Sequence, residues 1–434
     1  MTKRLDYHDP EFTVAFRSLI NSKREIQADV SETVARILAD VEARGDVAVC
    51  ELTAKFDRFH LTPESLAFQN HEISGARTAC SSETLAALEL AAERITAFHE
   101  KQMPNDLDEF DNIGIRLGYR WTAIDSAGLY VPGGTAAYPS SVLMNAIPAK
   151  VAGVKRLVMV VPTPDGNLNP LVLAAAEIAG VNEVYRVGGA QAIAALAYGT
   201  QTINAVDKIT GPGNAYVSAA KKQVFGIVGI DMIAGPSEIL VVADSHNDPA
   251  WISADLLSQA EHDPSAQAVL ITDDPGFASS IQPCIDAHLK TLPRAKIARA
   301  SWRNFGAIIT VPSLSDAIPL VNNFAPEHLQ IAIENPRDFA LKIRNAGAIF
   351  LGRFTPEAIG DYIAGPNHVL PTARSAKFSS GLSVLDFMKR TSMLECNSIG
   401  LKTLGPPAKT LAQAEGLDAH ALSIAIRLND PRMR

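Results

Sequence analysis

The chain has 434 residues, of which 47% are hydrophobic, and a formal net charge of -8 at pH 7. This length predicts two or more domains with a sizeable core, and the acidic balance without a basic run argues against a nucleic-acid-binding surface. The most apolar stretches, such as residues 157–161, are short and end at proline, so they indicate buried strands and not membrane spans.

The cysteines and the N-terminus bear on the compartment. Cys50, Cys80, Cys284 and Cys396 are scattered without CxxC spacing, and the first residues lack the apolar core of a signal peptide. Both features predict a reduced, cytoplasmic location.

The first hundred residues are predicted to be mostly helical, most clearly at 30–43 and 82–102. Between residues 123 and 242, strand-like runs then alternate with alanine-rich helical ones. The expected strands are 126–131, 156–161, 183–187 and 239–242, and the expected helices are 170–179 and 191–197. Such alternation is typical of βαβ units with a largely parallel sheet.

The pattern resumes after a helical region at 253–260. The expected strands are 268–272, 306–310 and 347–351, with a helix near 279–289. A second α/β unit is therefore predicted, and the tail after about residue 383 is expected to be helical and polar.

Gln259 and His262 form the first polar cluster of interest. They lie three residues apart in a segment with helical periodicity, so they are expected to share one helix face and could offer two ligands to one ion. The alternative is that His262 is an ordinary surface or core histidine and that Gln259, a rare metal ligand, is no ligand at all.

The second cluster is Pro326-Glu327-His328. One interpretation is a helix start, with proline at the first helical position and glutamate favoured by the helix dipole. The other is a chain turn from which both side chains reach a site. A carboxylate beside an imidazole gives two proton acceptors of different affinity, which suits a reaction with two distinct deprotonations.

Two further clusters lie toward the C-terminus. Residues 360–371 are rich in turn formers, so Asp361 and His368 are expected to project from a loop, although an Asx-turn and an ordinary loop imidazole are the alternatives. Residues 412–420 indicate a helix that ends at Gly416 before a new helix, and Glu415 and His420 could equally belong to a solvated connection. Asp361 and His420 add oxygen and nitrogen donors, a set that suits zinc or manganese better than an iron-sulfur cluster.

Taken in order, these clusters resemble the histidinol dehydrogenase family over nearly the whole chain. The segments that carry the resemblance are GLYVPGG at 128–134, VGGAQ at 187–191, GPGN at 211–214, AGPSE at 234–238, LSQAEH at 257–262, FAPEH at 324–328, GPNHVLP at 365–371 and SSGL at 379–382. No catalytic position of the family pattern is replaced. Residues 372–377 differ from the glycine-rich version of many members, which leaves the local loop geometry open.

The resemblance implies an α/β fold with two incomplete Rossmann-like domains, parallel sheets, and small N- and C-terminal helical parts that form a swapped dimer. The implied domains are residues 1–25 as an N-terminal extension, 26–127 with 239–381 as the first α/β domain, 128–238 as an inserted NAD-binding domain, and 382–434 as a dimer-swapped helical part. The site of each subunit would then be completed by its partner in a homodimer.

The resemblance also implies the ligands of the site. One Zn²⁺ per subunit would be held by Gln259, His262, Asp361 and His420 of the partner subunit. Tyr130, Gln191 and Asn214 match NAD-contacting positions of the family, although no GxGxxG fingerprint supports NAD independently and the glycine pairs could be plain turns. The matching substrate-binding residues are Ser237, Gln259, His262, His328, Asp361, His368, Glu415 and His420.

The implied activity is the oxidation of L-histidinol through L-histidinaldehyde to L-histidine with two NAD, the last steps of histidine biosynthesis. His328 would accept the alcohol proton, and Glu327 would activate the water that adds to the aldehyde. Two alternatives stay open. One is a related NAD-dependent dehydrogenase of another small alcohol, and the other is a metal-dependent hydrolase, since the same ligands and a water-activating glutamate would serve hydrolysis.

Overall fold

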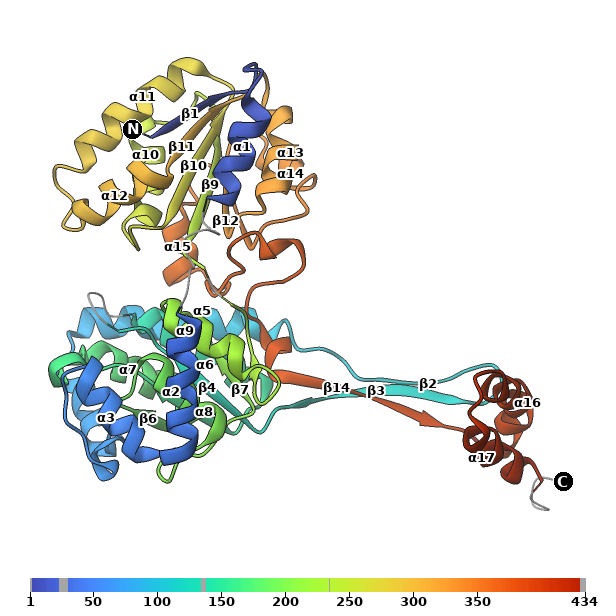
Figure 1. Ribbon diagram of the computed structural model, residues 1–434. Helices are drawn as coiled ribbons and strands as arrows, with labels where there is room; N and C mark the ends of the chain where they lie inside the picture. Colours follow the sequence, from blue (N-terminus) through green and yellow to red (C-terminus); the bar gives the residue numbers. More distant parts are fainter. Residues whose placement is uncertain (1, 23–29, 134–137, 234, 430–434) are drawn as a thin grey trace. The chain divides into compact units, whose positions relative to one another are not determined.

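The computed structural model describes residues 2–22, 30–133, 138–233 and 235–429. Gly134, Ala234 and the predicted domain boundary at residue 26 lie outside the described residues. The chain divides into two compact units (Figure 1). The first comprises Met1–Gln102 and Asp125–Phe387, and the second comprises Met103–Ile124 and Met388–Arg434.

The first unit contains a six-stranded parallel sheet in the order β1-β11-β10-β9-β12-β13. Its strands are β1 Lys3–Asp6, β9 Glu238–Ala243, β10 Gln267–Thr272, β11 Ala307–Thr310, β12 His328–Ala332 and β13 Ala348–Leu351. Every residue of β9, β10 and β12 is buried. These strands are covered on both faces, which explains their continuous apolar sequences.

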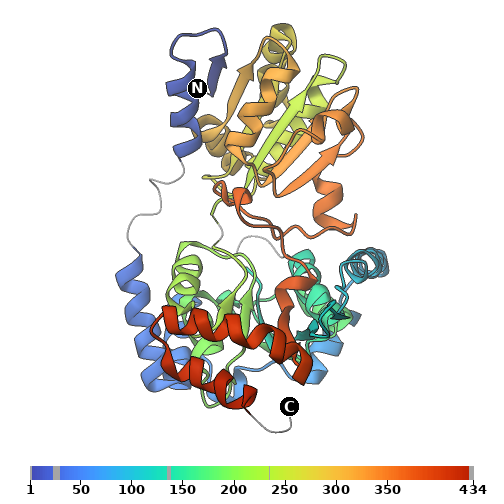
Figure 2. The ribbon, with the colours of Figure 1, turned by 90° about the vertical axis from the view of Figure 1, so that its right-hand side faces the viewer.

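Helices pack against both faces of this sheet (Figures 1 and 2). On one face lie α1 Phe12–Asn21, α13 Leu314–Phe324 and α14 Pro336–Ala340. On the other lie α10 Pro249–Ala260, α11 Pro275–His288 and α12 Ala295–Phe305. The short helix α15 Glu357–Tyr362 follows β13 and contacts α10.

A second parallel sheet of the same unit has the order β6-β5-β4-β7-β8. Its strands are β4 Ser126–Tyr130, β5 Arg156–Val160, β6 Glu183–Tyr185, β7 Lys208–Thr210 and β8 Gly229–Ile230. The helices within this segment are α6 Pro139–Ala152, α7 Pro170–Ala179, α8 Gly189–Tyr198 and α9 Ala215–Val224. Two α/β units with parallel sheets are therefore confirmed.

The helices of the first hundred residues pack with the five-stranded sheet. They are α2 Ser31–Arg44, α3 Asp46–Phe56, α4 Asn70–Thr78 and α5 Ser82–Glu100. The apolar face of α2 joins α8 and α9, while α4 and α5 contact α7 and α6. The grouping of 26–127 with 239–381 in one domain, which the family resemblance implies, stays a prediction.

Within the N-terminal residues, β1 pairs with β11 at the edge of the six-stranded sheet. Which segments would fold independently, and hence the domain boundaries, stays a prediction. The described residues of the first unit also form four short 3₁₀ turns: Pro63–Ser65, Pro164–Gly166, Ser375–Lys377 and Val384–Phe387.

The second unit is a three-stranded antiparallel sheet followed by two helices. β3 Arg116–Ala123 lies between β2 Leu107–Phe110 and β14 Met388–Glu395, and α16 Ser398–Ala414 and α17 Asp418–Leu428 follow. The prediction of an all-helical tail is wrong at β14. Nearly all of β14 is exposed, so the strand lacks the alternation that reveals half-buried strands, and its partner lies far away in sequence.

The turn between the last two helices is confirmed. α16 ends at Ala414, Gly416 adopts a φ of 73°, and α17 begins at Asp418. Glycine tolerates this left-handed conformation without steric cost. In the described part of the chain, no helix combines the length and the apolar character needed to cross a membrane.

Candidate active site

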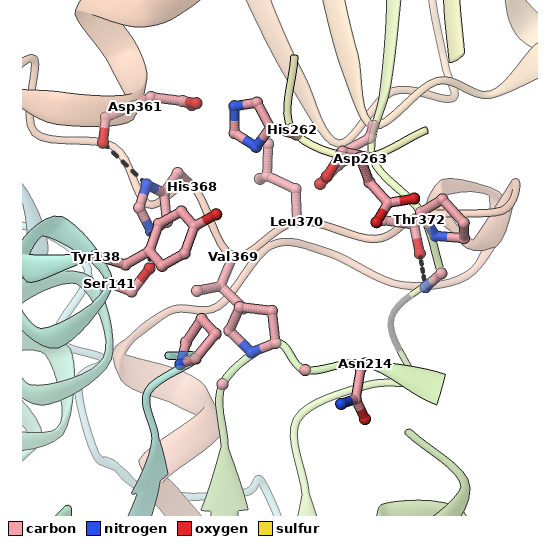
Figure 3. Close-up of a pocket in the computed structure, with 18 of the residues that line it drawn as sticks. Tyr138, Ser141, Asn214, His262, Asp263, Asp361, His368, Val369, Leu370 and Thr372 are labelled. Atoms are coloured by element: carbon pink, nitrogen blue, oxygen red, sulfur yellow. Dashed lines mark hydrogen bonds between the residues drawn. The ribbon is translucent and has the colours of Figure 1, made fainter. Parts of the chain in front are cut away.

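A cleft of about 580 Å³ lies where the two sheets of the first unit approach each other. Tyr130 and Gly211 line it from the carboxyl ends of β4 and β7. Ser237 and His328 line it from the amino ends of β9 and β12. The loops of one sheet thus face the strand starts of the other, and polar residues from both gather in one cleft (Figure 3).

Gln259 and His262 both reach this cleft, but not from one helix face. α10 ends at Ala260, so Gln259 lies in its last turn and His262 lies beyond it. The backbone N–H of His262 donates to the carbonyl oxygen of Gln259 at 3.2 Å. The expected shared helix face is corrected to a helix terminus, where a tight turn brings the two side chains to the same cleft.

Glu327 and His328 enter the cleft at the start of a strand. α13 ends at Phe324, Ala325 adopts a φ of 49°, and β12 begins at His328, so the helix-start interpretation of Pro326 is wrong. Both side chains are buried and line the cleft. The chain turn therefore brings the adjacent carboxylate and imidazole to one place, as the second interpretation predicted.

Glu238 at the start of β9 holds this pair. Its backbone N–H donates to Oε2 of Glu327 at 2.8 Å, and its carbonyl oxygen lies 3.1 Å from Nδ1 of His328. Hydrogen bonds to a neighbouring strand restrict both side chains, and Nε2 of His328 is buried without a hydrogen-bond partner among the described residues.

Asp361 lies in α15, so its expected loop position is wrong, whereas His368 lies in an irregular segment. Nδ1 of His368 is 2.9 Å from the carbonyl oxygen of Asp361, and its Nε2 is 3.4 Å from Oγ of Ser141 (Figure 3). Figure 3 also shows His262 beside Asp361 and Asn214 at the opposite end of the view. The turn-forming residues around 365–371 give no sign of the short helix α15 directly before them.

Glu357 was missed by the sequence reasoning. It begins α15, is 2% exposed, and places Oε1 3.4 Å from Nδ1 of His328. When the amide of Gln259 is oriented so that its nitrogen faces acceptors, that nitrogen donates to both carboxylate oxygens of Glu357. The spacing of Glu357 and Asp361, four residues apart on one helix face, is the signal that would have pointed to it.

These charges shift one another's pKa values. Burial raises the pKa of Glu357 to about 8, against the opposing effect of His328. Burial by itself would lower the pKa of His328, but attraction to Glu357, Glu327 and Asp361 raises it well above its ordinary value. Burial likewise disfavours the charged form of Asp361, yet its interaction with His328 leaves its pKa lowered.

The other two imidazoles have lowered pKa values. His368 is shielded from water by its surroundings, which outweighs the attraction of Asp361. His262 opens to the cleft, but the nearby walls exclude enough water to lower its pKa. At neutral pH both rings therefore keep a lone pair, which is the form that binds metals.

A divalent cation fits this group. One ligand atom each from His328, Glu357 and Asp361 lies within 4.8 Å of the others, and the Glu327 carboxylate is 3.7 Å from His328. Buried carboxylates and the unprotonated imidazole of His262 are a donor set that zinc accepts. Of the predicted ligands, Gln259, His262 and Asp361 line the same cleft. The structure thus supports a metal-binding group, while the exact ligand set stays a prediction.

Not all of the predicted NAD-contacting residues line the cleft. Tyr130 and Asn214 line the cleft, whereas Gln191 is 1% exposed inside α8 and does not line it within the described residues. The hydroxyl of Tyr130 accepts the N–H of Gly189 at 3.1 Å. Asn214 caps α9, because its Oδ1 accepts the N–H groups of Tyr216 and Val217. Their role toward NAD stays a prediction.

The remaining predicted residues lie in different units. Ser237 lines the cleft directly before β9. Glu415, which directly follows α16, and His420, in α17, belong to the second unit and are exposed. Because that unit is described by itself, their place in a site stays a prediction.

Comparisons with known proteins identify the family to which the chain is similar. The family model described as histidinol dehydrogenase matches residues 20–428. Histidinol dehydrogenase of Ruegeria pomeroyi is 62% identical over 429 residues, 99% of each chain, and that of Rhodospirillum rubrum is 62% identical over 430 residues, also 99% of each chain.

A solved structure extends the likeness to the fold. The crystal structure of histidinol dehydrogenase from Elizabethkingia anophelis superposes with a TM-score of 0.92 at 36% identity, covering 99% of this chain and 98% of that one. With a family model that matches nearly its whole length, the chain belongs to the histidinol dehydrogenase family.

Proposed function

We propose that the protein oxidises L-histidinol through L-histidinaldehyde to L-histidine, with two NAD consumed in succession, in the last steps of histidine biosynthesis. The observation that carries the proposal is the cleft in which Glu327 and His328 stand side by side next to Asp361. The names of relatives that match 99% of the chain support the substrate.

Gln259, His262, Asp361 and His420 of the partner subunit would hold one Zn²⁺ per subunit. When bound, the metal orients the substrate so that its reacting carbon is held against the cofactor. The buried carboxylates around His328 support this part of the proposal, because they supply the negative charge that a divalent cation needs.

The two catalytic residues would act on different protons. Nδ1 of His328 faces the Glu238 carbonyl oxygen, and Nε2 lies 3.5 Å from Oδ1 of Asp361. Nε2 is therefore the atom that would accept the alcohol proton once a bound divalent cation offsets the attraction of the surrounding carboxylates. Glu327 would take a proton from the water that adds to the aldehyde, giving a hydrate that can lose a second hydride. The hydrogen bond from the backbone N–H of Glu238 restricts the position of this carboxylate in the cleft.

NAD would lie toward the five-stranded sheet. Its carboxyl edge presents Tyr130, Gly211 and Asn214 to the cleft, and ligands of open parallel sheets bind outside the carboxyl ends of the strands. At Gly211, φ is 112° and a Cβ atom would collide with the carbonyl oxygen of Tyr130, so the turn after β7 requires glycine. Gln191 would act from within α8.

Ser237, His368 and Glu415 would contact the substrate. Glu415 would pair with the ammonium group of the substrate. We further propose a homodimer in which Glu415 and His420 of the partner subunit complete the site, in a cytoplasmic enzyme. Two features support the dimer. Asp361 and His368 also line a second cavity of about 840 Å³, and apolar residues of α17, Leu422 and Ile426, are 61% and 57% exposed.

The test is NADH formation by the purified, zinc-loaded protein with limiting L-histidinol, before and after chelation. Two NADH per histidinol, lost on chelation and restored by zinc, are expected. One NADH would indicate a relative that stops at the aldehyde. No NADH with any small alcohol would contradict the proposal and favour the hydrolase alternative.

The dimer is tested separately by mixing inactive Asp361→Asn and His420→Asn proteins. Mixed dimers would contain one intact site if the C-terminal part is exchanged, so activity should return. Unchanged inactivity of a mixture shown to contain mixed dimers would exclude the exchange.

A further inference from the structure

We propose that Glu357 is a positioning residue that holds the amide nitrogen of Gln259 and Nδ1 of His328 together, so that the Gln259 carbonyl oxygen and His328 Nε2 face the metal site. The inference rests on the proposed function, because it concerns the same zinc site. Glu357 itself would contact neither substrate nor metal.

The first contact fixes the amide of Gln259. An amide nitrogen can only donate and an ionised carboxylate can only accept, so contact with the ionised form of Glu357 determines which end of the amide points where. The remaining end of the amide is its oxygen, the only atom of glutamine that binds a cation. Without Glu357, the amide could rotate by half a turn and present N–H groups to the metal.

The second contact fixes the ring of His328. Nδ1 lies 3.1 Å from the Glu238 carbonyl oxygen and 3.4 Å from Oε1 of Glu357. Both neighbours accept hydrogen bonds, so Nδ1 carries a hydrogen atom. Nε2 then faces Asp361. It is buried and has no hydrogen-bond partner in the described part of the chain.

The position of Glu357 differs from that of the predicted metal ligands Gln259 and Asp361 and of the catalytic residue His328. Gln259, His328 and Asp361 line the cleft, whereas Glu357 does not line it in the described part of the chain. It is buried and contacts Gln259 and His328. Groups that orient metal ligands in this way contribute about 10- to 100-fold to metal affinity.

The helix α15 makes the arrangement rigid. Glu357 and Asp361 are one turn apart on this helix, so the residue that orients Gln259 and the predicted ligand Asp361 keep a fixed separation. A buried carboxylate is costly unless it is hydrogen-bonded, and the contacts with Gln259 and His328 satisfy it.

The experiment measures the zinc affinity of the full-length protein by competition with a chromophoric chelator. Glu357→Ala removes the acceptor and should weaken zinc binding about 10- to 100-fold. Glu357→Gln keeps an oxygen acceptor for Gln259 and should weaken it less than about tenfold. The visible absorption of the cobalt-substituted protein should shift in Glu357→Ala and stay near that of the wild type in Glu357→Gln.

Asp255→Asn is the matched control. Asp255 is a carboxylate on α10, the helix that carries Gln259. Its Oδ2 accepts a hydrogen bond from Nε2 of Gln330 at 2.7 Å, and among the described residues Asp255 does not line the cleft. This variant should keep wild-type zinc affinity. Thermal melting of all variants verifies folding. If Glu357→Ala fails to fold, the isosteric Glu357→Gln still allows zinc affinity to be compared with the wild type.

Three results would overturn the inference. Wild-type zinc affinity in Glu357→Ala would show that Glu357 positions nothing, and equal, large losses in both Glu357 variants would make it a ligand itself. An equal loss in Asp255→Asn would reduce the effect to general destabilisation. Failure of the proposed function looks different, since the wild type would then bind no zinc, or Asp361→Asn would bind it as tightly as the wild type.

Discussion

The carbonyl oxygen of Glu238 lies 3.1 Å from Nδ1 of His328, so the backbone of β9 fixes an imidazole at the start of β12. This contact predicts the effect of His328→Asn. Asparagine can keep the hydrogen bond near the Nδ1 position but offers no acceptor at Nε2. We expect turnover of L-histidinol to fall about 10²- to 10⁴-fold with little change in melting temperature.

Steady-state NADH formation and thermal melting check this prediction. His246→Asn is the control, because His246 is exposed beyond the opposite end of β9. Turnover within a factor of two of the wild type in His328→Asn would exclude His328 as the proton acceptor.

Glu327→Gln should impair the second oxidation more than the first. Oε2 of Glu327 accepts the N–H of Glu238, an acceptor role that the glutamine carbonyl can still fill, so the fold should persist while water activation is lost. Single-turnover experiments starting from histidinol and from histidinaldehyde measure the two steps. Glu334→Gln, an exposed position beyond β12, is the control. Equal losses in both steps would contradict the division of roles.

The buried ion pair of Lys221 and Asp231 predicts a large loss of stability on Lys221→Met. Both side chains are almost fully buried, and Asp231 also accepts the N–H groups of Gly211 and Met232. Removing the ammonium leaves a buried carboxylate unpaired, which costs about 3 to 5 kcal/mol. Urea unfolding measures this free energy, and Lys222→Met at the exposed neighbouring position is the control.

The same pair shapes the loop at Gly211, whose carbonyl oxygen accepts Nζ of Lys221 at 2.9 Å. The Michaelis constant for NAD should therefore rise in Lys221→Met more than that for histidinol. An unchanged value for NAD in the folded variant would argue against a cofactor site at this loop.

His99 predicts a contribution to the pH dependence of stability. Burial lowers its pKa, its Nδ1 lies 2.8 Å from the Ile95 carbonyl oxygen, and its Nε2 is buried without a hydrogen-bond partner among the described residues. Below its unfolded pKa of about 6.5 the unfolded chain binds a proton that the folded chain resists. Stability is therefore lost as pH falls from about 6.5 toward the lowered folded pKa, by at most about 1.4 kcal/mol per pH unit.

His99→Asn tests this expectation, because asparagine retains a donor near Nδ1 and has no group that titrates. The unfolding free energy should fall less steeply between pH 6.5 and 5 than in the wild type, while the exposed His60→Asn should match the wild type. An unchanged slope in His99→Asn would assign the effect to other histidines, such as His262 and His368.

Local sequence patterns predicted the elements of the two sheets well. The helix expected at 170–179 is α7, and the strands expected at 156–161 and 268–272 are β5 and β10 to within one residue at each end. Alternating apolar strands and amphipathic helices leave a strong local signal. The local signal fails where distant residues determine the structure. β14 pairs with β3, and α2 packs against helices that are also far away in sequence.

The site was predicted unevenly for the same reason. Glu327, His328 and Asp361 were identified as candidates, although Asp361 comes from a helix and not from a loop. Glu357 was missed because an isolated glutamate at a helix start is ordinary in sequence. Its significance appears only once β12 and α10 bring His328 and Gln259 to it.

The helices around the two sheets place partial charges of opposite sign on the two walls of the cleft. α6 and α9 begin at its five-stranded side, at Pro139 and Ala215, whereas α10 and α13 end at its six-stranded side, at Ala260 and Phe324. Helix starts carry partial positive charge and helix ends partial negative charge. The backbone alone thus favours a pyrophosphate at one wall and cations at the other. A ligand that carries an ammonium group is oriented by this field before any side chain touches it.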